Sequence, residues 1–103
     1  MDYQVSWSPE ALDDVEAIAS YIARDSTFYA AAVVQAILDA ARTLEKFPFR
    51  GRVVPEIAQD AIRERFVYSY RLIYRARDDE VTIAAVIHGR RLLNPVVDRI
   101  TRS

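Results

Sequence analysis

Residues 62–91, IRERFVYSYRLIYRARDDEVTIAAVIHGRR, are the stretch of this chain that decides its fold. β-Branched and aromatic side chains crowd residues 66–74 and 81–87, and such side chains are typical of strands. Asp78 and Asp79 lie between these two segments and indicate a two-residue polar turn. The stretch therefore predicts three consecutive antiparallel strands that carry most of the arginines.

A turn at these two aspartates divides the strand side chains between two faces, because side chains alternate across a sheet. One face carries Arg71, Ile73, Arg75 and His88 and is half apolar and half cationic. The other face is apolar and is expected to be the core: Tyr70, Leu72, Tyr74, Val81, Ile83, Ala85 and Ile87. The cross-strand pairs that follow are Arg75 with Thr82, Ile73 with Ala84, and Arg71 with Val86. A change of one residue in loop length would reverse this assignment.

Two helices are predicted before this stretch. Residues 3–7 alternate weakly and form a short first strand that can add to an edge of the sheet. The Ser-Pro-Glu of residues 8–10 is a helix-start signal, and apolar residues at helical spacing continue to about Ala23. A cap at residues 25–27 begins a second helix that is expected to end near residues 47–48. The short connection makes the helices antiparallel, so they form an alanine-rich hairpin suited to covering one face of the sheet.

The remaining segments complete a single α+β domain over residues 1–103. Residues 48–55, PFRGRVVP, indicate an ordered loop, and residues 56–61 indicate one helical turn. Asn94-Pro95 can cap a short C-terminal helix that ends near Ile100. The expected fold is a helical hairpin packed on a small antiparallel sheet, in the order β-α-α-β-β-β with a short C-terminal helix.

Composition fits one domain and excludes several classes of protein. Hydrophobic residues make up 51% of the 103 residues, which is enough for a core. The absence of cysteine excludes a disulfide framework and a thiolate metal site, and a single histidine supports metal binding poorly. No cofactor is expected. The N-terminus lacks a signal-peptide pattern, and no apolar run approaches the roughly 20 residues of a membrane helix, which predicts a cytoplasmic protein without membrane contact.

Charge is distributed unevenly along the chain, although the formal net charge is -1. Residues 1–47 carry three basic and eight acidic side chains, which gives -5. Residues 48–103 carry eleven basic and seven acidic side chains, which gives +4. Every basic residue except Lys46 is an arginine, which suits planar, multidentate recognition, although a GC-rich genome gives the same bias. The second half is therefore expected to present a cationic surface on a nearly neutral protein.

His88 is the first candidate for chemistry. Arg71 lies near it in the expected pairing, and Arg90 and Arg91 follow it. Such a cluster can hold a phosphate, with His88 as acid or base and with Glu56 completing the set if its loop folds over that face. The competing interpretation is structural, because a histidine at a strand end is usually structural or exposed and strand arginines often form a solvated outer face. The strand tyrosines indicate packing rather than base-stacking platforms: Tyr68, Tyr70 and Tyr74.

Three motifs in a fixed order resemble one known family. They are WSPEALDDVEAIASYIARDS, LEKFPFRGRVVPE and the stretch of residues 62–91 quoted above. In this order and spacing, over nearly the whole chain, they resemble the RelE/ParE superfamily of type II toxin-antitoxin toxins. The resemblance implies a small α+β fold with a helical hairpin on an antiparallel sheet. It also implies a cognate antitoxin as partner, whose C-terminal part wraps the toxin while its N-terminal part binds DNA.

The superfamily divides by target. RelE-like members cleave mRNA in the ribosome with basic residues and, in some branches, a Glu-Arg-His set followed by a C-terminal tyrosine, whereas ParE-like members inhibit DNA gyrase. Arg71 and His88 match positions that ribonuclease branches use, and Glu56 is the candidate match for the acid. Gly89 stands where a tyrosine is expected, however, and catalytic lysines are absent. The IHGRR ending and the PFRGR loop resemble the ParE branch, and a net charge of -1 is unlike the positive charge expected of a ribosome-docking protein.

The leading hypothesis is a ParE-like toxin that inhibits DNA gyrase by protein binding, is not an enzyme, and is neutralised by its antitoxin. One alternative is a ribosome-dependent mRNA endonuclease, with the ribosome and mRNA as partners, and another is an inactive relative that only binds antitoxin. The endonuclease alternative assigns catalysis to Arg71, His88, Arg63 and Glu56. The candidates for contact with a target are Arg63, Arg71, Arg75, His88, Arg90 and Arg91.

The antitoxin is expected to use two common modes of peptide recognition. An amphipathic antitoxin helix docks on the helical hairpin, and an extended antitoxin segment pairs with an edge of the sheet. An acidic antitoxin would suit the arginine-rich half of the chain. The hairpin residues predicted to contact it are Leu12, Val15, Ile18, Ile22, Val34 and Leu38.

Overall fold

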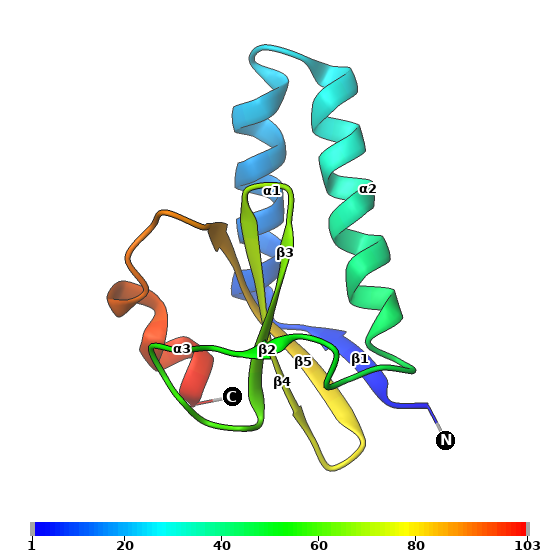
Figure 1. Cartoon of the computed structure of the whole chain (residues 1–103). Coiled ribbons are helices and arrows are strands. Elements are labelled where there is room, and N and C mark those ends of the chain that lie inside the picture. Colours follow the sequence, from blue (N-terminus) through cyan, green and yellow to red (C-terminus); the bar gives the residue numbers. More distant parts are fainter. Residues whose placement is uncertain (1, 103) are drawn as a thin grey trace.

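Five strands form one sheet in the order β1-β5-β4-β3-β2 in the computed structural model, which describes residues 2–102 (Figure 1). The strands are β1 (Gln4–Trp7), β2 (Arg52–Val53), β3 (Ile62–Val67), β4 (Tyr70–Arg77) and β5 (Glu80–His88). The predicted α+β class, the three consecutive antiparallel strands and the edge position of the first strand are confirmed. The sheet is mixed rather than purely antiparallel, because β1 runs parallel to β5. A parallel pair needs a long crossover connection, and the helical hairpin is part of that connection.

The two long helices are α1 (Pro9–Ala23) and α2 (Thr27–Thr43), and they lie side by side (Figure 1). Ser8 caps α1 by accepting the Ala11 N–H at 3.1 Å, and Ser26 caps α2 by accepting the Tyr29 N–H at 3.0 Å. Both predicted helix starts are confirmed. α2 ends at Thr43, about one turn earlier than predicted, because the chain then turns so that the Glu45 carbonyl accepts the Tyr3 N–H at 2.8 Å.

The helical hairpin covers one face of the sheet, as predicted. Val33 and Ile37 of α2 and Leu44 just after it are fully buried in one cluster with Leu72 and Tyr74 of β4. Three residues of α1 pack against this cluster while partly buried: Val15, Ile18 and Ile22. This hairpin-side core holds the two long helices on the sheet.

The opposite face of the sheet is also buried. A short 3-10 turn η1 (Asn94–Val96) and helix α3 (Val97–Thr101) pack there (Figure 1). Leu93, Val96 and Ile100 are buried in a second core with residues of the sheet and of the loop after β2: Val54, Ile62, Ile73, Ala84, Ala85 and Ile87. The predicted C-terminal helix is confirmed, whereas the interpretation of this face as a solvated outer surface is wrong.

A β-bulge changes the predicted pairing of the last two strands. The observed pairs are Arg75 with Thr82, Ile73 with Ala85, Arg71 with Ile87, and Tyr70 with His88. Cross-strand partners share a face, so His88 lies with Tyr70 on the hairpin side while Arg71 lies on the opposite face. The predictions that Arg71 and His88 share a face and that Ala85 and Ile87 belong to the hairpin-side core are therefore wrong.

The bulge arises from one residue and is held by distant contacts. Ala84 is the extra residue between the two registers, and a slip of one residue moves every later side chain to the other face. Asp14 of α1 accepts the Val86 N–H at 2.9 Å and also accepts two hydrogen bonds from Arg99 of α3, at 2.9 and 3.1 Å. These contacts join α1 and α3 to the edge of β5 beyond residue 83, where β5 no longer pairs with β1.

The turns around the strands are partly as predicted. Asp78 and Asp79 form the predicted two-residue turn, and both have positive φ (57° and 62°), as the favoured hairpin turns require. The predicted loop of residues 48–55 contains the two-residue strand β2, which pairs with β3. Residues 56–61, predicted to form one helical turn, are not helical. The chain instead turns at residues 55–57, where the Ala58 N–H donates to the Val54 carbonyl at 2.8 Å. None of the helices within residues 2–102 is long and apolar enough to span a membrane.

Gly51 lies where the fold leaves no room for a side chain. A Cβ there would overlap the Glu64 carbonyl oxygen and lie 2.7 Å from the Tyr74 hydroxyl. The Gly51 N–H donates to the same hydroxyl at 3.0 Å. Gly51→Ala is therefore expected to lower the free energy of unfolding by about 1–3 kcal/mol, measured by urea denaturation with Trp7 fluorescence.

Gly89→Ala is the matched control for this substitution. A Cβ on Gly89 would lie 3.2 Å from the Ser69 carbonyl oxygen, which requires a smaller adjustment. The loss of stability should be smaller than at Gly51. Equal losses at the two positions would show that the close approach at Gly51 is not a constraint.

Candidate functional site

Arg71 is the centre of a buried network of ion pairs on the face of the sheet opposite the helical hairpin. Its side chain is 5% exposed. Its Nε donates to Glu64 Oε1 at 2.6 Å, and Nη1 and Nη2 donate to the two carboxylate oxygens of Glu56 at 2.8 and 2.9 Å. Glu64 is also buried and accepts a second hydrogen bond, from Arg52 Nε at 2.7 Å. The network therefore balances two guanidinium groups with two carboxylates.

Three strands and a turn bring these side chains together. Arg52 of β2 pairs directly with Glu64 of β3, and Glu64 pairs with Ile73, two residues from Arg71 on the same face of β4. Glu56 comes from the turn after β2, which folds over this face. The condition under which Glu56 was expected to join Arg71 is thus met.

Hydrogen bonding fixes the charges in this network. The hydrogen bond from Arg71 lowers the pKa of Glu56 from 4.5 to about 2, although burial acts in the opposite direction. The hydrogen bond to Glu56 raises the pKa of Arg71 above its ordinary value, and burial again opposes this. Both groups are charged at neutral pH, and every guanidinium nitrogen of Arg71 is engaged by a carboxylate. This geometry is that of a structural cation.

Acid should weaken the fold through Glu56. The pKa of Glu56 is lower in the folded chain, so its contribution to stability is complete above pH 4.5 and is lost as the pH falls toward 2. Its side chain is 43% exposed, and solvent screening therefore limits this contribution to about 1 kcal/mol. Glu56→Gln is expected to be less stable than wild type by this amount at pH 7 and equally stable near pH 2, measured by urea denaturation.

Glu10→Gln is the matched control for the pH series. The Glu10 side chain is 47% exposed and meets one arginine nitrogen, on Arg102 at 3.2 Å. Its loss of stability at pH 7 should be smaller than that of Glu56→Gln, because the substitution removes a contact with only one arginine nitrogen. A difference between Glu56→Gln and wild type that stays constant across this range would contradict the assigned role of Glu56.

Arg63 lies on the hairpin face, across β3 and β4 from Tyr74, and therefore on the face opposite Arg71. Its side chain is 17% exposed and its guanidinium lies 5.0 Å from the centre of the Phe49 ring. It donates to three backbone carbonyls, those of Phe49, Gly51 and Asp60. Arg63 and Arg71, both assigned to catalysis in the endonuclease alternative, are therefore separated by the sheet, and Arg63 connects the loop before β2 to β3.

Arg75 shares the face of Arg71 but lies outside the network. Burial lowers its pKa, and the charge of Arg77 adds to this. Its Nη2 is buried without a hydrogen-bond partner among residues 2–102. The predicted target contact at Arg75 is thus only partly accessible.

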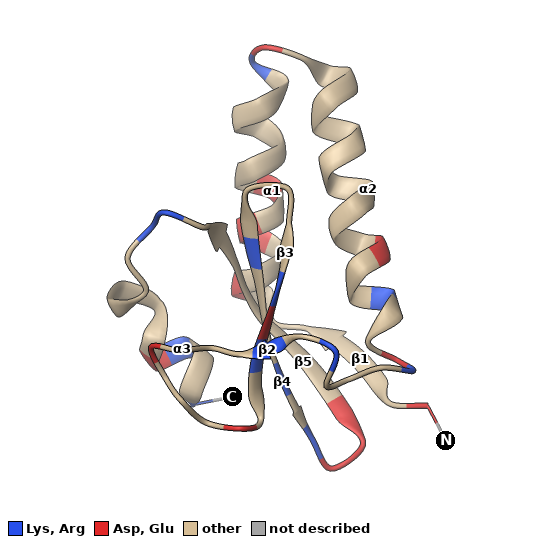
Figure 2. Cartoon of the chain, in the orientation of Figure 1, with Lys and Arg blue, Asp and Glu red and all other residues tan. Residues whose placement is uncertain are grey.

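His88, Arg90 and Arg91 are exposed at the end of β5 and in the loop that follows it, where Figure 2 shows a basic segment. The His88 ring lies on the hairpin side, 5.7 Å from the ring of Tyr70. Its Nδ1 accepts the Arg90 N–H at 3.1 Å. Of the four residues assigned to cleavage in the endonuclease alternative, only Glu56 and Arg71 come together. A phosphate beside His88 would be separated from Arg71 by the sheet.

The predicted antitoxin contacts differ in accessibility. Leu12 and Leu38 are 52% and 38% exposed, and Val34 lines a groove between α1 and α2. The other three predicted contacts are partly buried against the hairpin-side core: Val15, Ile18 and Ile22. A partner can therefore reach Leu12, Leu38 and the groove lined by Val34.

Glu64 is absent from the predicted site residues, yet it decides the role of Arg71. One signal for it exists in the sequence, because strand alternation places Glu64 on the same face as Ile62 and Arg71. An acid at a buried strand position needs a cation beside it. Within residues 2–102, no group of three or more histidine, aspartate or glutamate side chains is arranged to hold a metal ion.

Known proteins resemble this chain over most of its length. The family described as ParE toxin of type II toxin-antitoxin system, parDE, matches residues 5–93. Toxin RelE2 of Caulobacter vibrioides is 34% identical over 90 residues, which are 86% of this chain and 98% of that toxin. The family match covers the helical hairpin, almost all of the sheet and the buried network.

Two solved structures share the fold. A chain of the chromosomal ParDE TA system from P. aeruginosa superposes with a TM-score of 0.69 at 19% identity, over 84% of this chain and 95% of that one. A chain of the toxin-antitoxin complex RelBE2 from Mycobacterium tuberculosis superposes with a TM-score of 0.63 at 25% identity, over 85% of this chain and 99% of that one. With the family match across most of its residues, this chain belongs to the ParE toxin family of type II toxin-antitoxin systems, within the RelE/ParE superfamily.

Proposed function

We propose that this toxin inhibits DNA gyrase through protein contacts and that a cognate antitoxin neutralises it. The observation that carries this proposal is the position of Arg71. Its guanidinium is bound by Glu56 and Glu64 and lies across the sheet from His88. This arrangement favours a toxin that acts through its surface rather than through a catalytic centre.

Cleavage of mRNA needs a cation that stabilises charge on the phosphate and an acid or base within hydrogen-bond reach of the same phosphate. Breaking the buried pairs of Arg71 to free its guanidinium would cost about 3–5 kcal/mol. Even a freed Arg71 would remain on the face opposite His88. The two groups are therefore poorly placed to act on one bond.

The charge of the chain also favours a protein target. The formal net charge is -1, and acidic side chains gather on α1 while basic ones gather on β3, β4 and the loop after β5 (Figure 2). A protein that docks into ribosomal RNA gains affinity from each phosphate that it neutralises. Here the exposed cations Arg90 and Arg91 beside His88 form a small basic surface, which we propose as the contact with gyrase.

A second candidate function is ribosome-dependent mRNA cleavage of the kind found in RelE-like toxins. The 34% identity to Toxin RelE2 favours it. Under this function, His88 acts as the acid or base, and the cations nearest to it are Arg90 and Arg91 rather than Arg71. The two candidates differ in target and are separated by one pair of assays.

Inhibition of DNA supercoiling by the purified chain tests the proposal. With gyrase, ATP and relaxed plasmid, supercoiling should fall as the chain is added and should return when the antitoxin from the neighbouring reading frame is added. A translation extract with primer extension provides the comparison, because the second candidate predicts mRNA cut at the ribosomal A site. Full supercoiling together with cut mRNA would reject gyrase as the target.

For the antitoxin, we propose that an amphipathic helix docks on three apolar residues of the hairpin, Leu12, Val34 and Leu38. The exposure of Leu12 and Leu38, and the groove between α1 and α2 that the half-buried Val34 lines, support this placement. Leu38→Asp should raise the antitoxin concentration needed to restore supercoiling, whereas Ala17→Asp, at an exposed position of α1 outside this groove, should have a smaller effect. Equal effects would place the antitoxin elsewhere.

A further inference from the structure

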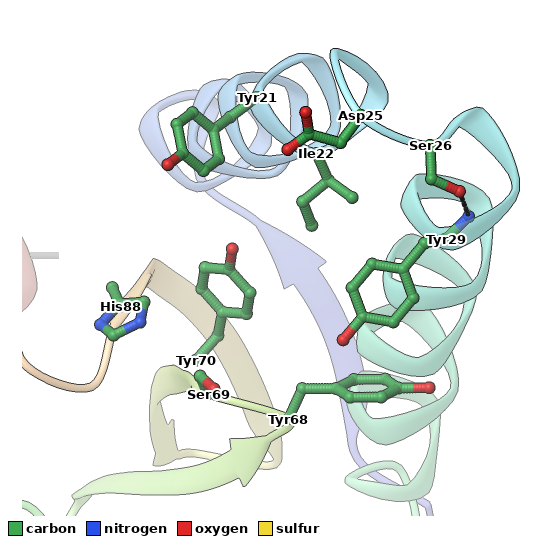
Figure 3. Close-up of a pocket in the computed structure, with 9 residues that line it drawn as sticks. All are labelled: Tyr21, Ile22, Asp25, Ser26, Tyr29, Tyr68, Ser69, Tyr70 and His88. Atoms are coloured by element: carbon green, nitrogen blue, oxygen red, sulfur yellow. Dashed lines mark hydrogen bonds between the residues drawn. The ribbon is translucent and has the colours of Figure 1, made fainter.

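A tyrosine-rich pocket lies between the tip of the helical hairpin and the turn that joins β3 to β4 (Figure 3). Its volume is about 380 Å³. Five rings and one carboxylate dominate its lining: Tyr21, Tyr29, Tyr68, Tyr70, His88 and Asp25. No lysine or arginine is among the residues that line it, within the part of the chain that the structure describes.

Ring contacts hold the aromatic walls of this pocket in place. Tyr29 and Tyr68 meet edge to face, with ring centres 5.9 Å apart, and Tyr70 meets His88 in the same way. Figure 3 shows Tyr70 pointing from β4 toward Tyr21 on α1, so the walls come from both the sheet and the hairpin. The pocket is therefore built by segments that the fold brings together, and its rings are preorganised.

Tyr68 holds a backbone conformation that few residues other than glycine adopt. Its φ is 54°, in the left-handed region, and its side chain is 56% exposed. A tyrosine that is half exposed gains little from burial in return for this strain. Strained residues of this kind cluster at binding sites, and here the strained turn presents the ring beside Tyr29.

Aromatic rings attract cations to their faces, because the face of the ring carries negative charge density. The chain shows this at its own surface, where the guanidinium groups of Arg24 and Arg52 lie 5.9 and 5.4 Å from the ring centres of Tyr21 and Phe66. Within residues 2–102, the three remaining pocket tyrosines carry no such guanidinium: Tyr29, Tyr68 and Tyr70. The pocket has the chemistry of a cation cage with no cation of its own among its lining residues.

The carboxylate of Asp25 favours a ligand with positive charge. It lies at the tip of the hairpin beside Ile22 and Tyr21 (Figure 3). Residues 1–47, which supply half of the pocket, carry a net charge of -5 from three basic and eight acidic side chains. A phosphate or nucleotide would meet Asp25 with no lysine or arginine in the lining to offset it. A guanidinium or ammonium group would pair with Asp25 and stack on the rings.

We propose that this pocket binds an arginine or lysine side chain that a partner protein presents, with the tyrosine rings stacking on the cation and Asp25 pairing with it. The occupant follows from charge complementarity and from the aromatic lining. The site is separate from the Arg71 network, which lies on the opposite face of the sheet. It shares one lining residue, His88, with the basic surface proposed to contact gyrase, but binding of a cation in the pocket can be tested without gyrase.

A titration of the isotopically labelled full chain with N-acetyl-arginine amide, followed by NMR, tests this site. Saturable shifts are expected for the ring signals of Tyr29, Tyr68 and Tyr70. N-acetyl-citrulline amide has nearly the same shape but no charge, and it should bind about tenfold more weakly or not at all. The titration contains neither gyrase nor ribosome, so its failure is distinguishable from failure of the proposed function.

Four variants locate the effect. Asp25→Asn and Tyr29→Leu should each weaken binding of the arginine probe about threefold to tenfold, whereas Tyr29→Phe should retain most of it because the ring face remains. Phe28→Leu is the matched control, since Phe28 is 84% exposed beside Tyr29 and does not line the pocket. Its affinity for the probe should equal that of wild type.

Three outcomes would overturn the proposal. They are equal affinity for the arginine and citrulline probes, unchanged binding in both Asp25→Asn and Tyr29→Leu, and no saturable shift at these tyrosines. A fourth outcome, tighter binding of uridine 5′-monophosphate than of the arginine probe, would identify the pocket as a nucleotide site instead.

Discussion

Replacing Arg71 with alanine is expected to lower the free energy of unfolding by about 3–5 kcal/mol, because it leaves a buried carboxylate without its main partner. Glu64 is 1% exposed and would keep only the hydrogen bond from Arg52. Domains are stable by only about 5–15 kcal/mol, so this single change approaches loss of the fold. Urea denaturation followed by Trp7 fluorescence measures the change.

Arg77→Ala is the matched control for this prediction. Arg77 lies on the same strand, its side chain is 63% exposed, and its contact with Asp78 is long at 3.8 Å. Its removal should change stability by less than about 0.5 kcal/mol. Arg71→Lys should fall between the two, since lysine keeps the charge but cannot form the paired hydrogen bonds. A loss at Arg71 no larger than that at Arg77 would remove the structural role from the network.

The double variant Arg71→Met with Glu64→Leu should recover most of the lost stability, because replacing a buried pair by apolar side chains is often nearly neutral. The partners left behind can be hydrated, since Glu56 and Arg52 have side chains 43% and 60% exposed. This variant is a folded chain without the Arg71 guanidinium. It therefore separates a structural role of Arg71 from a catalytic one.

Ile100→Ala is expected to lower the free energy of unfolding by about 2–5 kcal/mol, as is usual for truncation of a fully buried aliphatic side chain. Ile100 of α3 is 0% exposed and belongs to the second core with Ile73 and Ile87. The effect arises only if α3 seals the face of the sheet opposite the helical hairpin. Urea denaturation provides the measurement.

Leu92→Ala is the matched control for the second core. Leu92 lies close to Ile100 in the sequence but is 76% exposed, so its truncation should change stability by less than about 0.5 kcal/mol. Similar small losses at both positions would mean that α3 does not seal this face in solution.

Local signals in the sequence were sufficient for most of the fold. The caps at Ser8 and Ser26 depend on hydrogen bonds within three residues, and the turn at Asp78-Asp79 depends on its own backbone conformation. Each is therefore visible in a few consecutive residues. The order of the longer elements and the helical hairpin follow from such signals and are confirmed, whereas the two-residue strand β2 was not predicted.

The division of the sheet into faces depends on distant contacts, and there the sequence was misleading. One extra residue, Ala84, moves the rest of β5 to the other face, and its neighbour Val86 is held by Asp14, 72 residues away. No local pattern specifies that bulge. The same change separates His88 from Arg71, whereas Glu56 and Arg71 come together.

The sequence indicated that Glu56 would lie beside Arg71 if its loop folded over the cationic face of the sheet. It did not indicate the role of Arg71, because that role depends on a third residue, Glu64. The buried carboxylate of Glu64 accepts a hydrogen bond from Arg71 Nε at 2.6 Å. This contact makes Arg71 a structural cation rather than a phosphate ligand.

Growth of cells that express the Arg71→Met, Glu64→Leu chain without antitoxin is the measurement that tests most directly whether toxicity depends on a catalytic arginine. The chain must first be shown to be folded and present at the soluble level of wild type. A toxin that acts through protein contacts should still arrest growth as wild type does. Normal growth with the folded variant, beside arrest by wild type, would contradict the account and restore a catalytic role to Arg71.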